Sequence, residues 1–179
     1  DIGFAFDGDG DRLIAVDENG KEVDGDNIIA LFAKNLIKKN KLPKKLVVTT
    51  VMSNLGFENY LNEKLKVKLI RKNVGDINVI SEMKKKGLVL GGEQSGHIIL
   101  GHYMNTGDGI LAALKITELL SKEKVKASAL FKLYENFPQY KINLKLDKII
   151  TNKTNKSIEK ISLEFKNKFK SLRFLIRKS

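Results

Sequence analysis

Apolar residues in this chain follow two spacings, one typical of strands and one typical of helices. Continuous apolar or β-branched runs at residues 2–6, 13–16 and 46–51 predict strands, and the run at 46–51 is typical of a strand buried on both faces. Shorter runs predict further strands at residues 67–70 and 88–90.

Between these runs, apolar residues spaced three and four apart predict helices. The first helix begins at Asp24, which can cap it. In the segment from residue 75 to 86, Ile77, Ile80 and Met83 lie on one helical face. The remaining helices are expected at residues 53–65, 108–120 and 127–134. Strands that alternate with helices in this way predict an α/β fold with a mixed, largely parallel sheet and flanking helices.

The pattern changes after residues 137–138, Phe-Pro. Residues 140–146 alternate polar and apolar side chains, as a strand with one exposed face does, and residues 151–157 are polar and linker-like. An amphipathic helix is expected from Ile158, and residues 172–176 predict a final strand. Because nothing follows that could pair with this strand, the last residues resemble the first piece of another domain.

Composition limits the possible classes. The 179 residues allow one large domain or one domain plus pieces, and a hydrophobic content of 42% is enough for a buried core. The absence of cysteine excludes disulfides and thiolate metal sites. No apolar run reaches about 18 residues, and no charged-then-apolar leader precedes the first strand, so we expect a cytoplasmic protein without membrane contact.

The formal net charge of +12 comes almost wholly from lysine. A nucleic-acid-binding surface is one interpretation, but the lysines lie in amphipathic patterns typical of solvated helix faces, and no arginine-rich or aromatic-interleaved stripe occurs. We therefore expect a surface suited to small anionic substrates, and no nucleic-acid partner.

The most distinctive segment is residues 7–12, Asp-Gly-Asp-Gly-Asp-Arg, which lies between two predicted strands. The carboxylates of Asp7, Asp9 and Asp11 repel one another unless a cation lies among them, and hard oxygen ligands suit Mg²⁺ or Ca²⁺. Arg12 adds a guanidinium that matches phosphate. A simple turn needs only one Asp-Gly pair, and an EF-hand needs glycine where Arg12 stands and helices at both flanks. We therefore predict a metal loop between strands.

A second polar loop, residues 91–97, follows the strand predicted at 88–90, where open α/β sheets bind ligands. Glu93, Ser95 and His97 offer a carboxylate, a hydroxyl and an imidazole suited to sugar hydroxyls, and no base-activated serine is implied. The alternative is a polar loop in which His97 only caps neighbouring backbone. His102 has no motif around it and is expected in a surface loop.

Together the two loops resemble one family, the α-D-phosphohexomutases. Residues 7–12 are similar to its metal-binding loop and residues 92–97 to its sugar-binding loop, at the spacing typical of the family. Further similar segments are residues 53–54, 74–76 and 106–109. The form Gly-Glu-Gln-Ser-Gly-His, with Thr-Gly-Asp-Gly downstream, is most similar to bacterial phosphoglucosamine mutases, whereas phosphomannomutase/phosphoglucomutase relatives more often have Met at Gln94.

The resemblance implies four domains, of which this chain holds a portion. Residues 1–17 would be the C-terminal end of the second domain, and residues 18–138 the α/β third domain. Residues 139–179 would be a hinge and the truncated start of an α+β fourth domain, with residues 177–179 opening its phosphate-binding loop. The serine that carries the phosphate would belong to the first domain, upstream of Asp1.

The resemblance also implies roles for single residues. Asp7, Asp9 and Asp11 would hold Mg²⁺ against the phosphoserine, where the ion neutralises charge that develops during phosphoryl transfer. As a catalytic residue, Arg12 would contact phosphate oxygens near the metal.

The other implied roles concern the substrate. Glu93 and Ser95 would hold sugar hydroxyls, and His97 would support their loop or assist proton transfer. Arg177 and Ser179 would grip the phosphate that is not transferred.

The function implied is that of a fragment of an isomerase-class phosphotransferase, which interconverts glucosamine 6-phosphate and glucosamine 1-phosphate through a phosphoserine and a bisphosphorylated sugar. Ile77 and Asn78 stand where the glucosamine enzymes commonly have Arg-Tyr, so a phosphomannomutase or phosphoglucomutase remains the alternative. A basic polyanion-binding module and a Ca²⁺-binding structural domain are alternatives from other classes. Expected partners are a phosphosugar and the missing domains of a parent enzyme. A homodimer is one assembly expected for that parent enzyme. We expect no turnover by the isolated chain.

Overall fold

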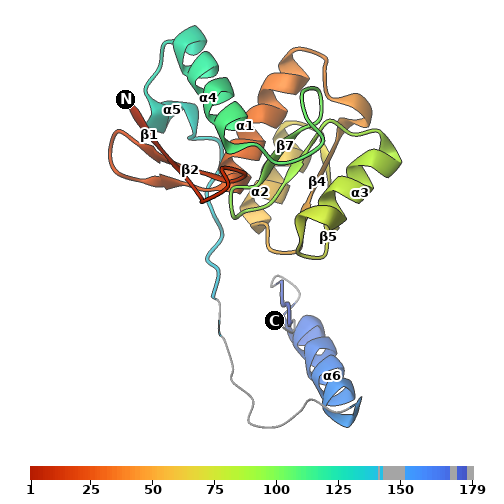
Figure 1. Cartoon of the computed structure of the whole chain (residues 1–179). Coiled ribbons are helices and arrows are strands. Elements are labelled where there is room, and N and C mark those ends of the chain that lie inside the picture. Colours follow the sequence, from red (N-terminus) through yellow and green to blue (C-terminus); the bar gives the residue numbers. More distant parts are fainter. Residues whose placement is uncertain (141, 143–151, 170–172, 177–179) are drawn as a thin grey trace. The chain divides into compact units, whose positions relative to one another are not determined.

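A computed structural model describes residues 1–140, 142, 152–169 and 173–176 (Figure 1). The chain divides into two units, Asp1–Phe137 and Pro138–Ser179. No helix among the described residues is both long and apolar enough to cross a bilayer.

The first unit begins with a small antiparallel sheet of order β1-β2-β3. Strand β1 (Ile2–Phe6) pairs with β2 (Leu13–Asp17), so that Phe6 lies opposite Leu13 and residues 7–12 close the hairpin. Both strands confirm the sequence prediction. The third strand, β3 (Glu22–Val23), was not predicted, because a two-residue strand carries no periodicity of its own.

The second sheet of this unit has the order β5-β4-β6-β7. Strand β4 (Leu46–Thr50) is parallel to both β5 (Lys68–Lys72) and β6 (Leu90–Gly92). Strand β7 (Ile98–Leu100) is antiparallel to β6 and was also not predicted. The mixed, largely parallel sheet expected from the sequence is therefore confirmed.

Helices cover both faces of this sheet. Val47 of β4 packs in the larger core with α1 and α4, whereas Val48 packs with α3 on the opposite face (Figure 1). This alternation confirms that the strand is buried on both sides. The helices are α1 (Gly25–Lys38), α2 (Leu55–Asn59), α3 (Asp76–Lys86), α4 (Gly109–Glu123) and α5 (Ala127–Leu130), with a 3-10 turn η1 (Pro43–Lys45) and a π-helical turn η2 (Tyr60–Lys64).

Side-chain caps fix where three helices begin. Asp24 accepts from the N–H of Asn27 at the start of α1, and Asp108 accepts from that of Leu111 at the start of α4. Asn54 caps α2 in the same way.

The packing face of α3 differs from the expected one. Ile77 is 70% exposed, whereas Val79 and Met83 are buried and Ile80 packs against them only in part. Val79 and Met83 define the face that packs on the sheet, and Ile77 lies about 200° around the helix from Val79, so its side chain points away from that face.

The second unit contains one described helix, α6 (Asn152–Lys168), in which Phe165 stacks on Phe174 with ring centroids 5.1 Å apart. The expectation that residues 151–157 form a linker is wrong from Asn152 onward, since the helix begins there. Residues 173–176, the described part of the predicted final strand, are not in a strand. Apart from Tyr140 and Ile142, the strand predicted at 140–146 lies outside the described residues.

Candidate functional site

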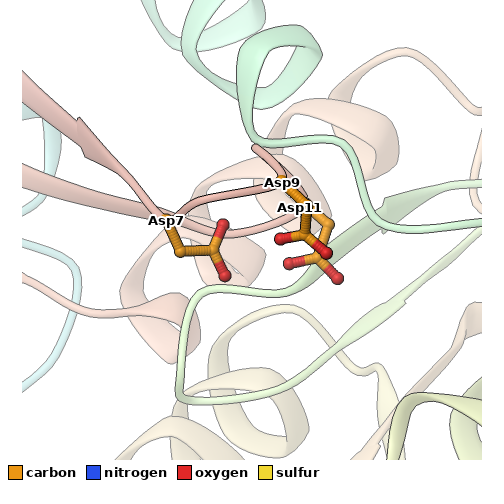
Figure 2. A group of neighbouring side chains, drawn as sticks. All are labelled: Asp7, Asp9 and Asp11. Carbon is orange, nitrogen blue, oxygen red and sulfur yellow. The ribbon is translucent and has the colours of Figure 1, made fainter.

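The acidic loop between β1 and β2 brings its three carboxylates together. One oxygen from each of Asp7, Asp9 and Asp11 lies within 4.8 Å of the other two, and the side chains turn toward a common point (Figure 2). Asp7 and Asp9 are exposed and Asp11 is half-buried, so solvent reaches the group. Oxygen donors so disposed fit Mg²⁺ or Ca²⁺, as the sequence predicts.

Arg12 balances part of this negative charge. Its backbone N–H donates to Asp7 Oδ1 at 3.1 Å, and its Nε lies 3.6 Å from Asp7 Oδ2 and 3.8 Å from Asp11 Oδ1. Loss of water contact raises the pKa of Asp7, but the hydrogen bond from the Arg12 N–H and the Arg12 charge lower it, and that pKa stays below the ordinary 3.8. Asp7 is therefore an anion at neutral pH.

His97 lies beneath the acidic loop and is only 2% exposed. Its Nε2 accepts a hydrogen bond from the backbone N–H of Gly107 at 3.2 Å, so this nitrogen carries no proton. Nδ1 then carries the ring proton and donates to Asp11 Oδ2 at 3.0 Å. The imidazole thus fixes Asp11 against the segment that leads into α4.

Main-chain hydrogen bonds join the same segments. The N–H of Leu13 donates to the carbonyl of Gly96 at 3.0 Å, and the N–H of Gly109 donates to that of Gly10 at 2.9 Å. Arg12 and His97 also form an isolated antiparallel bridge. The acidic loop, the loop at residues 93–97 and the start of α4 are therefore one hydrogen-bonded assembly.

Glycines make this close approach possible. A Cβ at Gly96 would overlap the carbonyl of Leu13, and one at Gly109 would overlap that of Arg12. At Gly107 a Cβ would overlap the imidazole ring of His97. The Thr-Gly-Asp-Gly segment thus supports the site through its backbone, a role that its residue types did not reveal.

The predicted sugar-binding residues lie at the end of β6. Glu93 is 8% exposed, and its Oε1 accepts from the N–H of Gly75 at 3.0 Å while its Oε2 accepts from Ser95 Oγ at 3.3 Å. Ser95 itself is exposed. Gln94 Nε2 donates to Asp24 Oδ2 at 3.2 Å, which ties the loop to the N-terminus of α1. Gly75 was not predicted as a partner of Glu93, because its contribution is a backbone N–H.

Three remaining predictions concern residues elsewhere. Arg177 and Ser179 lie outside the described residues. His102 is exposed, as expected, and its Nε2 lies 3.1 Å from the carbonyl of Lys41. It lines a hollow of about 430 Å³ between the C-terminal part of α1 and α4, apart from the loops described above.

Comparison with known families identifies the second sheet and its helices. Residues 24–137 match the family described as phosphoglucomutase/phosphomannomutase, alpha/beta/alpha domain III. The matched residues begin at the cap of α1 and end at Phe137, so they exclude the acidic loop.

Similar proteins extend the match through that loop. The chain is 48% identical over 151 residues to a phosphoglucosamine mutase of Desulfotalea psychrophila, and the aligned residues cover 84% of this chain and 33% of the relative. It is 44% identical over 189 residues to that of Finegoldia magna, covering 100% of this chain and 40% of the relative. The chain thus spans about a third of the length of the curated relatives.

Solved structures show the same fold. A phosphoglucomutase/phosphomannomutase family protein from Burkholderia thailandensis superposes with a TM-score of 0.67 at 28% identity, over 74% of this chain and 29% of that one. An N-acetylphosphoglucosamine mutase of Aspergillus fumigatus, solved with GlcNAc-6P and magnesium, gives 0.64 at 20% identity over 77% and 36%. The second likeness shows the fold alone.

Proposed function

This chain belongs to the α-D-phosphohexomutase family, and we propose that it is part of a phosphoglucosamine mutase. The reaction is the interconversion of glucosamine 6-phosphate and glucosamine 1-phosphate through a phosphoserine and a bisphosphorylated sugar. The observation that carries the proposal is the joining of the acidic loop to the loop at residues 93–97 through His97. Relatives named phosphoglucosamine mutase, at 44–48% identity, support the choice of sugar.

Asp7, Asp9 and Asp11 are the proposed ligands of Mg²⁺, since they supply only hard oxygen donors and lie within reach of one ion. When bound, the ion supplies positive charge against the phosphoryl group that is transferred. Arg12 lies at the rim of this group with half of its side chain exposed, and its guanidinium is placed to contact phosphate oxygens.

Glu93 and Ser95 are the proposed sugar ligands. Ser95 is exposed and can exchange its bond to Glu93 for one to a sugar hydroxyl. The N–H of Gly75 keeps the Glu93 carboxylate in one orientation when that happens. His97 is proposed as a positioning residue for Asp11, because both of its ring nitrogens are already engaged with protein partners.

The proposed domain assignment follows the family. Residues 1–17 would end the second domain, residues 18–138 would form the third, and residues 139–179 would be the hinge and start of the fourth. The serine that carries the phosphate and the remainder of the phosphate-binding loop begun by Arg177 and Ser179 would come from other parts of the enzyme. We also propose that the parent enzyme is cytoplasmic, and a homodimer is one assembly proposed for it.

Turnover of three substrates by the full-length enzyme tests the sugar assignment. Glucosamine 6-phosphate should be converted with a higher kcat/KM than glucose 6-phosphate or mannose 6-phosphate. Greater activity on mannose phosphate would contradict the assignment and favour a phosphomannomutase. The 179-residue chain by itself should show no turnover on any of the three, because the serine proposed to carry the phosphoryl group would lie outside it.

A further inference from the structure

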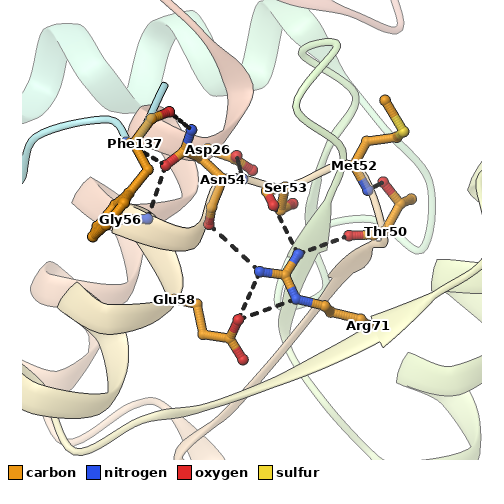
Figure 3. Close-up of polar contacts among 9 residues, drawn as sticks. All are labelled: Asp26, Thr50, Met52, Ser53, Asn54, Gly56, Glu58, Arg71 and Phe137. Atoms are coloured by element: carbon orange, nitrogen blue, oxygen red, sulfur yellow. Dashed lines mark hydrogen bonds and ion pairs between the residues drawn. The ribbon is translucent and has the colours of Figure 1, made fainter. Parts of the chain in front are cut away.

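Asn54 holds the last residue of the first unit by a two-way hydrogen bond (Figure 3). Its Nδ2 donates to the carbonyl of Phe137 at 2.9 Å, and the N–H of Phe137 donates to its Oδ1 at 2.9 Å. The carboxamide therefore satisfies both backbone groups of one residue, as a neighbouring strand would. The same Oδ1 also accepts from the N–H of Gly56 and so caps α2.

The residues just before Phe137 are held by the same helical segment. The ring of Tyr134 lies 6.0 Å from that of Phe57 and 5.8 Å from that of Tyr60, measured between centroids. The carbonyl of Glu135 approaches Gly56 so closely that a Cβ there would overlap it. The segment at residues 134–137 therefore lies along α2 and η2, and Asn54 makes the last of these contacts.

Asn54 is itself fixed from two other elements and is only 2% exposed. Asp26 of α1 accepts from the Asn54 backbone N–H at 2.7 Å through Oδ2. Arg71 of β5 donates to the carbonyls of Ser53 at 2.8 Å and Asn54 at 3.5 Å, and it forms a salt bridge of 2.7 Å with Glu58 of α2 (Figure 3). The side chain that holds Phe137 thus stands on a rigid base.

We propose that Asn54 is a positioning residue that clamps the chain at Phe137, so that the segment leading into the second unit begins at Pro138. An amide is required, because it carries a donor and an acceptor on separate atoms that can pair at the same time with the carbonyl and the N–H of Phe137. Phe137 itself is 47% exposed, and beyond it Tyr140 is 93% and Ile142 79% exposed, so exposure rises further after the clamped residue. The inference goes beyond the proposed function and does not depend on the sugar.

Hydrogen exchange of backbone amides in the 179-residue chain tests this clamp. In Asn54→Ser the hydroxyl can still cap α2, but it is too short to reach Phe137. The Phe137 amide should exchange at least about tenfold faster in this variant, while the amides of β4 keep their protection. Asn54→Asp retains the acceptor for the Phe137 N–H and loses the donor, so its effect should be smaller.

Asn78→Ser is the matched control, because Asn78 also donates from Nδ2 to a backbone carbonyl, that of Val74, at a site remote in sequence from Phe137. It should leave Phe137 exchange unchanged. The wild-type chain provides a second measurement, in which the Phe137 amide should be protected and that of Tyr140 should not. Unchanged Phe137 exchange in Asn54→Ser, a uniform rise that includes β4, or equal protection at Phe137 and Tyr140 would each overturn the proposal.

Discussion

His97 Nδ1 lies 3.0 Å from Asp11 Oδ2, although the two residues are 86 positions apart in the sequence. Because Nε2 accepts a hydrogen bond from the N–H of Gly107, the ring's single N–H is at Nδ1 and donates a hydrogen bond to the carboxylate. The acidic loop is thereby braced by a residue of the loop at residues 93–97, and the bracing ring is buried. Residues assigned to binding of metal and of sugar are thus parts of one structure.

His97→Ala should lower the free energy of unfolding by about 3 kcal/mol, because it leaves the buried Gly107 N–H without an acceptor and opens a cavity. Urea denaturation followed by circular dichroism measures this. His102→Ala removes an exposed imidazole with one contact and should change stability by less than about 0.5 kcal/mol. Equal losses in the two variants would contradict the bracing role.

Gly107→Ala tests the close approach of the backbone to the ring. The added methyl group overlaps the His97 imidazole, so the variant should lose about 2 kcal/mol of stability. Gly8→Ala is the matched control in the acidic loop, since a Cβ at Gly8 meets no atom within 4 Å. A Gly107→Ala variant as stable as Gly8→Ala would show that the ring moves aside without cost.

Local signals in the sequence predicted much of this fold. Asp24, Asn54 and Asp108 cap α1, α2 and α4 through backbone N–H groups nearby in the chain, and each cap lies within one residue of the predicted helix start at 24, 53 or 108. The strand at β4 was evident because its residues are apolar on both faces. The convergence of Asp7, Asp9 and Asp11 followed from their spacing within one hairpin loop.

The missed features depend on partners distant in the sequence. β7 has only three residues and becomes a strand because β6 pairs with it. The exposure of Ile77 depends on which face of α3 packs on the sheet, and that face carries Val79 and Met83. The support of Glu93 and His97 comes from the backbone N–H groups of Gly75 and Gly107, which every non-proline residue possesses and no residue type reveals.

Asp26→Asn should change how stability depends on pH. Burial raises the pKa of Asp26 to about 6, and the negative charge of Asp24 adds to the rise. The Asn54 N–H, Ser53 and the charge of Arg71 lower this pKa, but by less than burial raises it. The pKa of Asp26 in the folded state is above the ordinary 3.8. The stability that this carboxyl contributes is therefore present below about pH 4 and lost as pH rises through about 6. The loss amounts to about 3 kcal/mol, from a rise of about 2 pKa units.

The free energy of unfolding of Asp26→Asn should therefore increase relative to that of the wild type as pH rises from about 4 to about 8. Urea denaturation across that range measures this. Glu82→Gln is a control of opposite sign, since a hydrogen bond from Lys72 lowers the pKa of Glu82 below 4.5. Its wild-type carboxylate contributes stability above about pH 4.5 that is lost on acidification. A constant difference between Asp26→Asn and wild type across pH would show that the buried carboxyl does not titrate in this range.

The central claim is that residues 7–12 form a divalent-cation site joined to the loop at residues 93–97 through His97. NMR line broadening by Mn²⁺, a paramagnetic substitute for Mg²⁺, tests it most directly in the 179-residue chain. Broadening should centre on residues 7–12 and 107–109, with roughly millimolar affinity because three carboxylates fill only part of the coordination sphere, and Mg²⁺ should reverse it. Asp9→Asn should abolish the effect, and Asp76→Asn, which changes an exposed aspartate of α3, should not. Broadening centred elsewhere, or unchanged in Asp9→Asn, would contradict the account.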